Sequence, residues 1–170
     1  MALRDIVLYP HKSLTTAAEP VESFDEDLHT LIDDLAETMY AADGIGIAAN
    51  QIDVLQRVTV IDVDPKGDSQ LLELVNPKVV SSSGKQKGSE GCLSFPGLTE
   101  DVKRAEEVTV EYQDRDGNKQ SIDADGLLAV ALQHEIDHLD GVVFTDRLGP
   151  IKKKMALKRY KKLLEEHQNG

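Results

Sequence analysis

Residues 125–141, DGLLAVALQHEIDHLDG, constrain the fold more strongly than any other segment of the chain. Residues 127–132 are all apolar, and Gly141 is a typical residue for the end of a helix. A helix that is apolar on every side must be covered by other elements on every side. We therefore expect one central helix here, with the rest of the chain packed around it.

The second half of this helix carries the motif H-E-x-x-H, formed by His134, Glu135 and His138. Residues four apart lie on one face of a helix, so the two imidazoles can bind one metal ion. Glu135 lies beside them, in position to carry a proton for water that the metal activates. The simple alternative is a helix with two surface histidines, but the preceding apolar run favours a buried, dry site.

A metal site needs a third ligand, and the sequence offers few. The pattern H-E-x-x-H-x-x-G-x-x-H would require a histidine where the chain has Phe144. Glu165 and Glu166 lie in a charged C-terminal segment that we expect to be exposed. Cys92, the only cysteine, is then the best remaining candidate, in the stretch EGCLSFPG at residues 90–97. One thiolate and two imidazoles would leave a coordination position open, as catalytic sites do.

Charge is unevenly distributed along the 170 residues, whose net charge is −12. Residues 151–170 carry +5, so the preceding body carries −17. Such a body repels nucleic acid, whereas the basic segment either contacts a phosphate-rich surface or is simply a solvated helix. A single cysteine excludes an intrachain disulfide and favours a reducing compartment. Because the sequence shows no signal peptide and no membrane-spanning run, we expect a cytoplasmic protein.

Periodicity predicts the other elements. Ser23 and Glu26 have the spacing of a capping box, ahead of an amphipathic helix that should end near Gly44. Proline at position 150 is a typical first residue for the basic C-terminal helix. Short apolar or β-branched runs indicate strands at residues 57–64 and 71–77 and a hairpin at residues 107–124.

This order of elements predicts the fold class. Strands cluster in the middle of the chain, helices lie at both ends, and no β-α-β alternation occurs. We expect an α+β fold, with antiparallel β-sheets packed around a central helix carrying H-E-x-x-H, plus a C-terminal helix. Residues 1–149 should form the body, with the basic helix of residues 150–170 as an appendage of the same domain.

A third stretch, GIGIAANQ at residues 44–51, lacks the lysine and the spacing of a phosphate-binding loop. In this order, GIGIAANQ, EGCLSFPG and QHEIDHLDG resemble the three signature motifs of the peptide deformylases. The similarity runs from DIVLYP to about Gly149, which identifies residues 1–149 as a deformylase catalytic domain. The basic helix resembles the C-terminal extension of many bacterial members.

The resemblance implies a metal-dependent hydrolase. It removes the N-formyl group from the N-terminal formylmethionine of nascent polypeptides and releases formate. Cys92, His134 and His138 would hold one divalent ion, natively Fe²⁺, for which Zn²⁺ or Ni²⁺ can substitute. Glu135 would carry the proton.

The resemblance also assigns roles to the other two motifs. The side-chain amide of Gln51 and the backbone N–H of Leu93 would hold the developing oxyanion. Backbone groups of Ile45, Gly46 and Gly91 would pair with an extended substrate. After Pro96 the chain lacks an arginine that many bacterial relatives carry, so a charged contact to later substrate residues is in doubt.

The resemblance also implies which partners the protein has. Formylmethionyl nascent peptides are the expected substrates, and the basic helix is a candidate contact to the ribosome; we expect no membrane contact and no sequence-specific nucleic acid. Two other classes compete with this interpretation. One is a zinc peptidase of the H-E-x-x-H type with a third ligand other than Cys92, and the other is a non-catalytic metal-binding paralogue.

Overall fold

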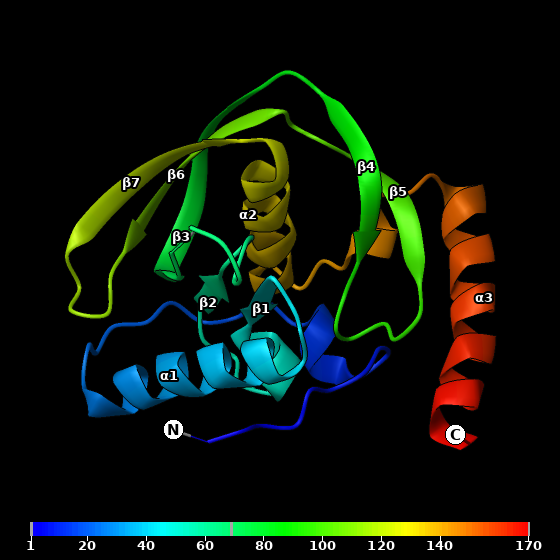
Figure 1. Ribbon diagram of the computed structural model, residues 1–170, viewed down its shortest axis with the longest axis horizontal. Coiled ribbons are helices and arrows are strands. Elements are labelled where there is room, and N and C mark those ends of the chain that lie inside the picture. The colour runs from blue at the N-terminus through cyan, green and yellow to red at the C-terminus, as the bar shows by residue number, and fades with distance from the viewer. Residues whose placement is uncertain (1, 69, 170) are drawn as a thin grey trace.

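A computed structural model describes residues 2–68 and 70–169 of the chain (Figure 1). The larger sheet is antiparallel throughout and has the strand order β1-β2-β3-β6-β7. A smaller antiparallel sheet contains only β4 and β5. The strands are β1 (Gly46–Ala48), β2 (Val58–Ile61), β3 (Leu72–Ser83), β4 (Gln86–Gly91), β5 (Thr99–Arg104), β6 (Glu107–Gln113) and β7 (Lys119–Asp125).

The helix α2 (Gly126–Leu139) lies between the two sheets, at the centre of the molecule (Figure 1). Its side chains Ala129, Leu132 and Ile136 belong to a buried apolar cluster with residues of β2, β3 and β6. The central helix that the sequence predicted is therefore confirmed. Because both sheets cover α2, its polar second half lies in the interior as well.

The helix α1 (Glu26–Ala41) packs its apolar face against β1 and β2. The residue that caps it is Asp25, whose side chain accepts a hydrogen bond of 3.0 Å from the Leu28 N–H. The prediction that Ser23 caps this helix was wrong. Asp25 is one of the best N-cap residues and lies one position before the first helical residue, so it takes the role.

The strand β3 is longer than the predicted strand at 71–77, which we expected to end at Pro77. The register with β6 shifts between Val75 and Lys78, and Asn76 has a φ of 51°. This irregularity accommodates a proline that could not donate to a regular ladder. The strand then continues to Ser83 and carries the chain toward the smaller sheet.

The β4–β5 sheet was not predicted, because its residues are QKGSEG and TEDVKR and lack an apolar run. It presents only one face to the interior, through Val102, Glu90 and Arg104. The connection between its two strands spans residues 92–98 and contains Cys92. The smaller sheet is therefore the element that brings Cys92 to α2.

The helix α3 (Pro150–Asn169) packs on the outside of the connection that carries Cys92. Tyr160 is buried against Phe95, and its hydroxyl donates a hydrogen bond of 2.6 Å to the Tyr9 carbonyl. The basic residues of α3 mostly face outward. None of the helices in the described part of the chain combines the length and apolar character needed to cross a bilayer.

Candidate metal centre and substrate pocket

Three candidate ligands from distant parts of the sequence converge beside α2. Cys92 follows β4 directly, whereas His134 and His138 lie one turn apart on α2. One donor atom from each residue lies within 4.8 Å of the other two, and Cys92 Sγ is 3.3 Å from His138 Nε2. Within residues 2–68 and 70–169, this is the only cluster of His, Cys, Asp or Glu with such spacing.

The surroundings of His134 fit a bound cation. Its Nδ1 lies 3.0 Å from Glu90 Oε1, which leaves Nε2 as the nitrogen available to a metal. Burial alone would lower the pKa of His134, but hydrogen bonds to Cys92 and Glu90 raise it to about 10. The site therefore stabilises positive charge strongly, and its sulfur and nitrogen donors suit a divalent transition metal.

The environment of His138 is different. Burial, together with the charges of His134 and Arg104, lowers the pKa of His138 well below its usual value. The ring is therefore neutral, the form in which an imidazole binds a metal. Its Nδ1 is buried without a hydrogen-bond partner in the described part of the chain. Apart from the contact of its Nε2 with Cys92 Sγ, packing holds this second imidazole.

Glu90 is held in turn by an arginine that the sequence analysis did not single out. Arg104 donates two hydrogen bonds to the Glu90 carboxylate, of 2.9 and 2.8 Å, and a third of 2.6 Å to Asp137. Burial alone would raise the pKa of Glu90, but its bonds from Arg104 and His134 lower the pKa to about 2. The carboxylate therefore stays ionised and can fix the ring of His134.

The hydrogen-bond network continues from Arg104 through Asp137 to the surface. Asp137 also accepts two hydrogen bonds from Arg147, of 2.9 and 2.6 Å.

The sequence analysis missed Glu90, Arg104 and Asp137 as site residues, although a signal was present. Asp137 lies inside the H-E-x-x-H motif and Glu90 two residues before Cys92, so both were close to the metal ligands from the start.

Glu135 lies in the interior with one carboxylate oxygen, Oε1, lacking a hydrogen-bond partner among the described residues. Burial raises the pKa of Glu135 to about 7. The other oxygen, Oε2, faces Gly46 so closely that a Cβ at position 46 would lie 2.6 Å from it. A carboxyl group with this pKa can both accept and donate a proton near neutral pH.

Gln51 points its amide donor toward Cys92. Its Oε1 accepts a hydrogen bond of 3.0 Å from the Ala48 N–H, which fixes the orientation of the amide. Its Nε2 donates to Ser94 Oγ at 3.2 Å and lies 3.6 Å from Cys92 Sγ. The side chain is only 1% exposed, so its donor group is aimed at the ligand cluster rather than at solvent.

A pocket of about 430 Å³ opens beside these groups. Its lining includes Ile45 and Gly46, at the edge strand of the larger sheet, and Gly91, the last residue of β4. The apolar first half of α2 forms another wall, through Leu127, Val130 and Ala131. Also in the lining are Gln51, Cys92, Leu93, His134 and Glu135. The structure thus places nearly every residue singled out from the sequence around one cavity, the exception being the buried His138.

The Glu90 carboxylate should control metal affinity. In the variant Glu90→Gln, the buried Arg104 loses a charged partner and His134 loses the anion that orients it. We expect a loss of about 3–5 kcal/mol in the free energy of unfolding and a metal affinity about 10- to 100-fold weaker. Chemical denaturation and competition with a chelator measure the two effects.

The matched control is Glu111→Gln, which removes an exposed glutamate from β6. It should leave both measurements unchanged. Metal affinity in Glu90→Gln equal to that of the unmodified chain would contradict the role of Glu90.

Comparisons with known proteins agree with this geometry. A family model described as polypeptide deformylase matches residues 3–154. A peptide deformylase of Alkalilimnicola ehrlichii is 46% identical over 166 residues, which cover 98% of this chain and 93% of the relative. One from Chromobacterium violaceum is 47% identical over 169 residues, with 99% of each chain covered. The crystal structure of a peptide deformylase from Legionella pneumophila superimposes with a TM-score of 0.93 at 46% identity, and 99% of each chain is covered. The chain belongs to the polypeptide deformylase family.

Proposed function

We propose that Cys92, His134 and His138 hold a divalent metal ion, natively Fe²⁺, in a peptide deformylase that acts on nascent polypeptides. The enzyme hydrolyses the N-terminal formylmethionine of its substrate to formate and a free amine. The observation that carries the proposal is the convergence of three ligand atoms beside Glu135, a buried glutamate whose Oε1 has no hydrogen-bond partner among the described residues. The same donors also accept Zn²⁺ or Ni²⁺.

A metal ion bound there supplies Lewis acidity and an activated water molecule. Glu135 provides the proton transfer. Its carboxylate takes up the proton of the attacking water and passes it to the departing nitrogen. The burial that raises the pKa of Glu135 to about 7 lets it perform both steps near neutral pH.

The oxygen of the formyl group gains negative charge as water adds to its carbon. The Gln51 amide lies close to Cys92 and is oriented by the Ala48 N–H, so it can donate to this oxygen once the N–H that faces Cys92 Sγ is turned to it. The Leu93 N–H is the second proposed donor, since Leu93 also lines the pocket.

The rest of the pocket orients the substrate. Ile45, Gly46 and Gly91 all line it, so an extended peptide can hydrogen-bond to their backbone groups as an added strand. The methionine side chain then rests on the apolar wall that α2 provides through Leu127, Val130 and Ala131.

The competing interpretations lose their support. A zinc peptidase of another fold is incompatible with the family match and with the close approach of Cys92 to His138. A purely structural metal site does not explain why the buried Glu135 leaves its Oε1 without a hydrogen-bond partner among the described residues, nor why the amide of Gln51 is oriented toward Cys92.

The basic helix α3 is proposed to contact the ribosome in the cytoplasm. Lys158, Lys161 and Lys162 are exposed and have no carboxylate partner among the described residues. They belong to a segment of charge +5 on a body of charge −17. Exposed amines of this kind are suited to phosphate contacts, and such contacts weaken as salt rises.

Formate release is the direct test of the activity. The chain loaded with Fe²⁺ or Ni²⁺ under anaerobic conditions should release formate from formyl-Met-Ala-Ser. Glu135→Gln should keep its metal but lose roughly 10²–10⁴-fold in rate, because the proton carrier is missing. Metal analysis alongside the assay separates the outcomes: no formate from metal-loaded protein rejects the activity, and metal loss in Glu135→Gln would make Glu135 a ligand.

Gly46 should be required for the position of the Glu135 carboxylate. In Gly46→Ala the new methyl group would lie 2.6 Å from Glu135 Oε2, so the carboxylate has to move. We expect kcat to fall by at least about tenfold, as for other displaced acid-base groups, with metal content unchanged.

The control is Gly88→Ala in β4, where a Cβ meets nothing within 4 Å. Its kcat should equal that of the unmodified enzyme. An equally active Gly46→Ala would mean that the carboxylate does not need its observed position.

Ribosome binding should depend on the charge of α3. The variant Lys158→Glu with Lys161→Glu and Lys162→Glu reverses three exposed charges and should abolish salt-sensitive cosedimentation with ribosomes. Each lysine–phosphate contact favours binding by releasing a counterion from the RNA, and each reversal removes one such contact. Formate release from the short peptide should not change. Undiminished cosedimentation would leave these lysines as a solvated helix face.

A further inference from the structure

The segment that precedes α1 links two of the three sequence motifs to each other. Residues 2–8 form neither helix nor strand, so their main-chain groups are free to bond to other elements. The Val7 N–H donates a hydrogen bond of 2.8 Å to the Gln51 carbonyl, and the Tyr9 N–H donates one of 2.9 Å to the Ser94 carbonyl. Gln51 ends GIGIAANQ, and Ser94 belongs to EGCLSFPG. The N-terminal segment therefore ties these two motifs together.

The link between the motifs also reaches the Gln51 side chain. Its Nε2 donates to Ser94 Oγ at 3.2 Å, and each of the two residues is at most 1% exposed. Because a buried donor depends on a partner at a fixed place, the position of Ser94 helps to decide where this N–H points. A shift of the Ser94 main chain would therefore shift the proposed oxyanion donor.

A hydroxyl group from α3 holds the N-terminal segment at Tyr9. The Tyr160 hydroxyl donates a hydrogen bond of 2.6 Å to the Tyr9 carbonyl and lies 3.5 Å from the Ser94 carbonyl. Both main-chain groups of Tyr9 are thus bonded to other segments, its N–H to Ser94 and its carbonyl to Tyr160. A bond at Tyr160 therefore reaches Gln51 through only two intermediate residues.

The ring of Tyr160 contributes separately from its hydroxyl. The ring centroid lies 4.9 Å from that of Phe95 and 6.0 Å from that of Tyr9, inside a buried apolar cluster. A phenylalanine at this position would keep these contacts and lose only the hydroxyl. The effect of the hydrogen bond can therefore be separated from the packing of α3.

The buried face of α3 is also separate from its basic face. Tyr160 is 3% exposed, whereas Lys158, Lys161 and Lys162 in the same turns are exposed. A variant of the three lysines therefore changes the charge of the helix without touching the hydroxyl.

We propose that the Tyr160 hydroxyl positions the Gln51 amide, through Tyr9 and Ser94, for the oxyanion of the reaction. This inference rests on the proposed deformylase activity. An oxyanion donor is effective only when it is held ready for the developing charge, so a small displacement caused from a distance lowers the rate. Tyr160 is a positioning residue, and on this proposal α3 contributes to the rate of the reaction.

The first test is Tyr160→Phe in the Ni²⁺-loaded enzyme, with formyl-Met-Ala-Ser as substrate. We expect kcat to fall by about threefold to tenfold, a part of the roughly 10²–10³-fold that loss of an oxyanion donor costs. KM and metal content should stay unchanged, because the hydroxyl touches neither the pocket lining nor the metal ligands.

A double-mutant cycle shows whether the effect passes through Gln51. In a Gln51→Leu background the target of the positioning is gone, so Tyr160→Phe should change kcat by less than about twofold. A purely structural effect of Tyr160 would instead multiply with the effect of Gln51→Leu. The same fold-loss in both backgrounds would therefore overturn the proposal.

A matched control and a measurement independent of activity complete the test. Tyr40→Phe removes another tyrosine hydroxyl, which donates to Asp62 at 2.7 Å, and neither residue lines the substrate pocket. Its kcat should equal that of the unmodified enzyme. Amide hydrogen exchange at Val7 and Tyr9 should speed up in Tyr160→Phe and not in Tyr40→Phe. Unchanged exchange in Tyr160→Phe would mean that the hydroxyl does not hold the segment.

The outcomes distinguish this inference from the activity on which it rests. No formate from the unmodified metal-loaded chain would reject the deformylase activity and this role with it. An equal kcat in Tyr160→Phe beside an active unmodified enzyme would reject this role alone. If Tyr160→Phe does not fold, Ser94→Ala removes the hydroxyl that faces Gln51 and should lower kcat in the same way, and an unchanged kcat there would overturn the proposal.

Discussion

The Glu90 carboxylate is the contact on which the proposed metal site depends. It joins the smaller sheet to α2, because it accepts two hydrogen bonds from Arg104 of β5 and one from His134. A buried ion pair contributes little net stability, since the cost of removing both charges from water offsets their attraction. Its value here is geometric: it fixes the tautomer of His134 and the distance between the sheet that carries Cys92 and the helix that carries both histidines. Stability comes instead from the apolar contacts of Ala129, Leu132 and Ile136.

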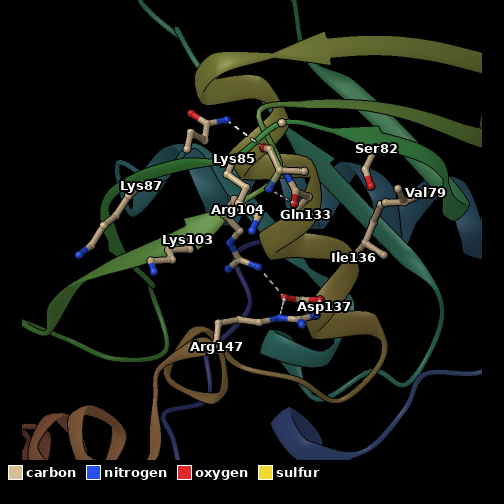
Figure 2. A pocket seen from close by; sticks show the side chains of 13 residues that line it. Val79, Ser82, Lys85, Lys87, Lys103, Arg104, Gln133, Ile136, Asp137 and Arg147 are labelled. Carbon is tan, nitrogen blue, oxygen red and sulfur yellow. Dashed lines mark hydrogen bonds and ion pairs between the residues drawn. The ribbon is translucent and has the colours of Figure 1, made fainter.

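The same network gives α2 two different faces. Toward the 430 Å³ pocket it presents apolar side chains together with His134 and Glu135. The apolar side chains suit the side chain of the substrate, and the two polar residues suit the formamide group that reacts. Toward a second pocket, of about 650 Å³, it presents Asp137, which pairs with both Arg104 and Arg147 (Figure 2). Asp137 therefore helps to hold Arg104 against Glu90.

The sequence predicted the elements whose signals are local and missed those that depend on register. The central helix and the hairpin around Asp116-Gly117 follow from periodicity and turn chemistry, and both are present. The family motifs directed attention to the residues of one cavity. The β4–β5 sheet could not be predicted, because its strands are polar and gain their order from a single buried face. The pairing of Glu90 with Arg104 was equally hidden: neither residue is the other's register partner, and both turn toward α2 only once the strands are paired.

The structure explains why three separate motifs occur together, since each touches the other two. A Cβ on Gly44 would lie 2.7 Å from Leu93 Cδ1, and one on Gly46 would lie 2.6 Å from Glu135 Oε2. The first glycine of GIGIAANQ thus makes room for EGCLSFPG, the second makes room for HEIDH, and Gln51 ends the motif with its amide 3.6 Å from Cys92 Sγ. Cys92 Sγ and His138 Nε2 then close the triangle at 3.3 Å. A side chain added at Gly44 or Gly46 would force Leu93 or the Glu135 carboxylate to shift, so the glycines of GIGIAANQ let these two side chains keep their positions beside the proposed metal ligands.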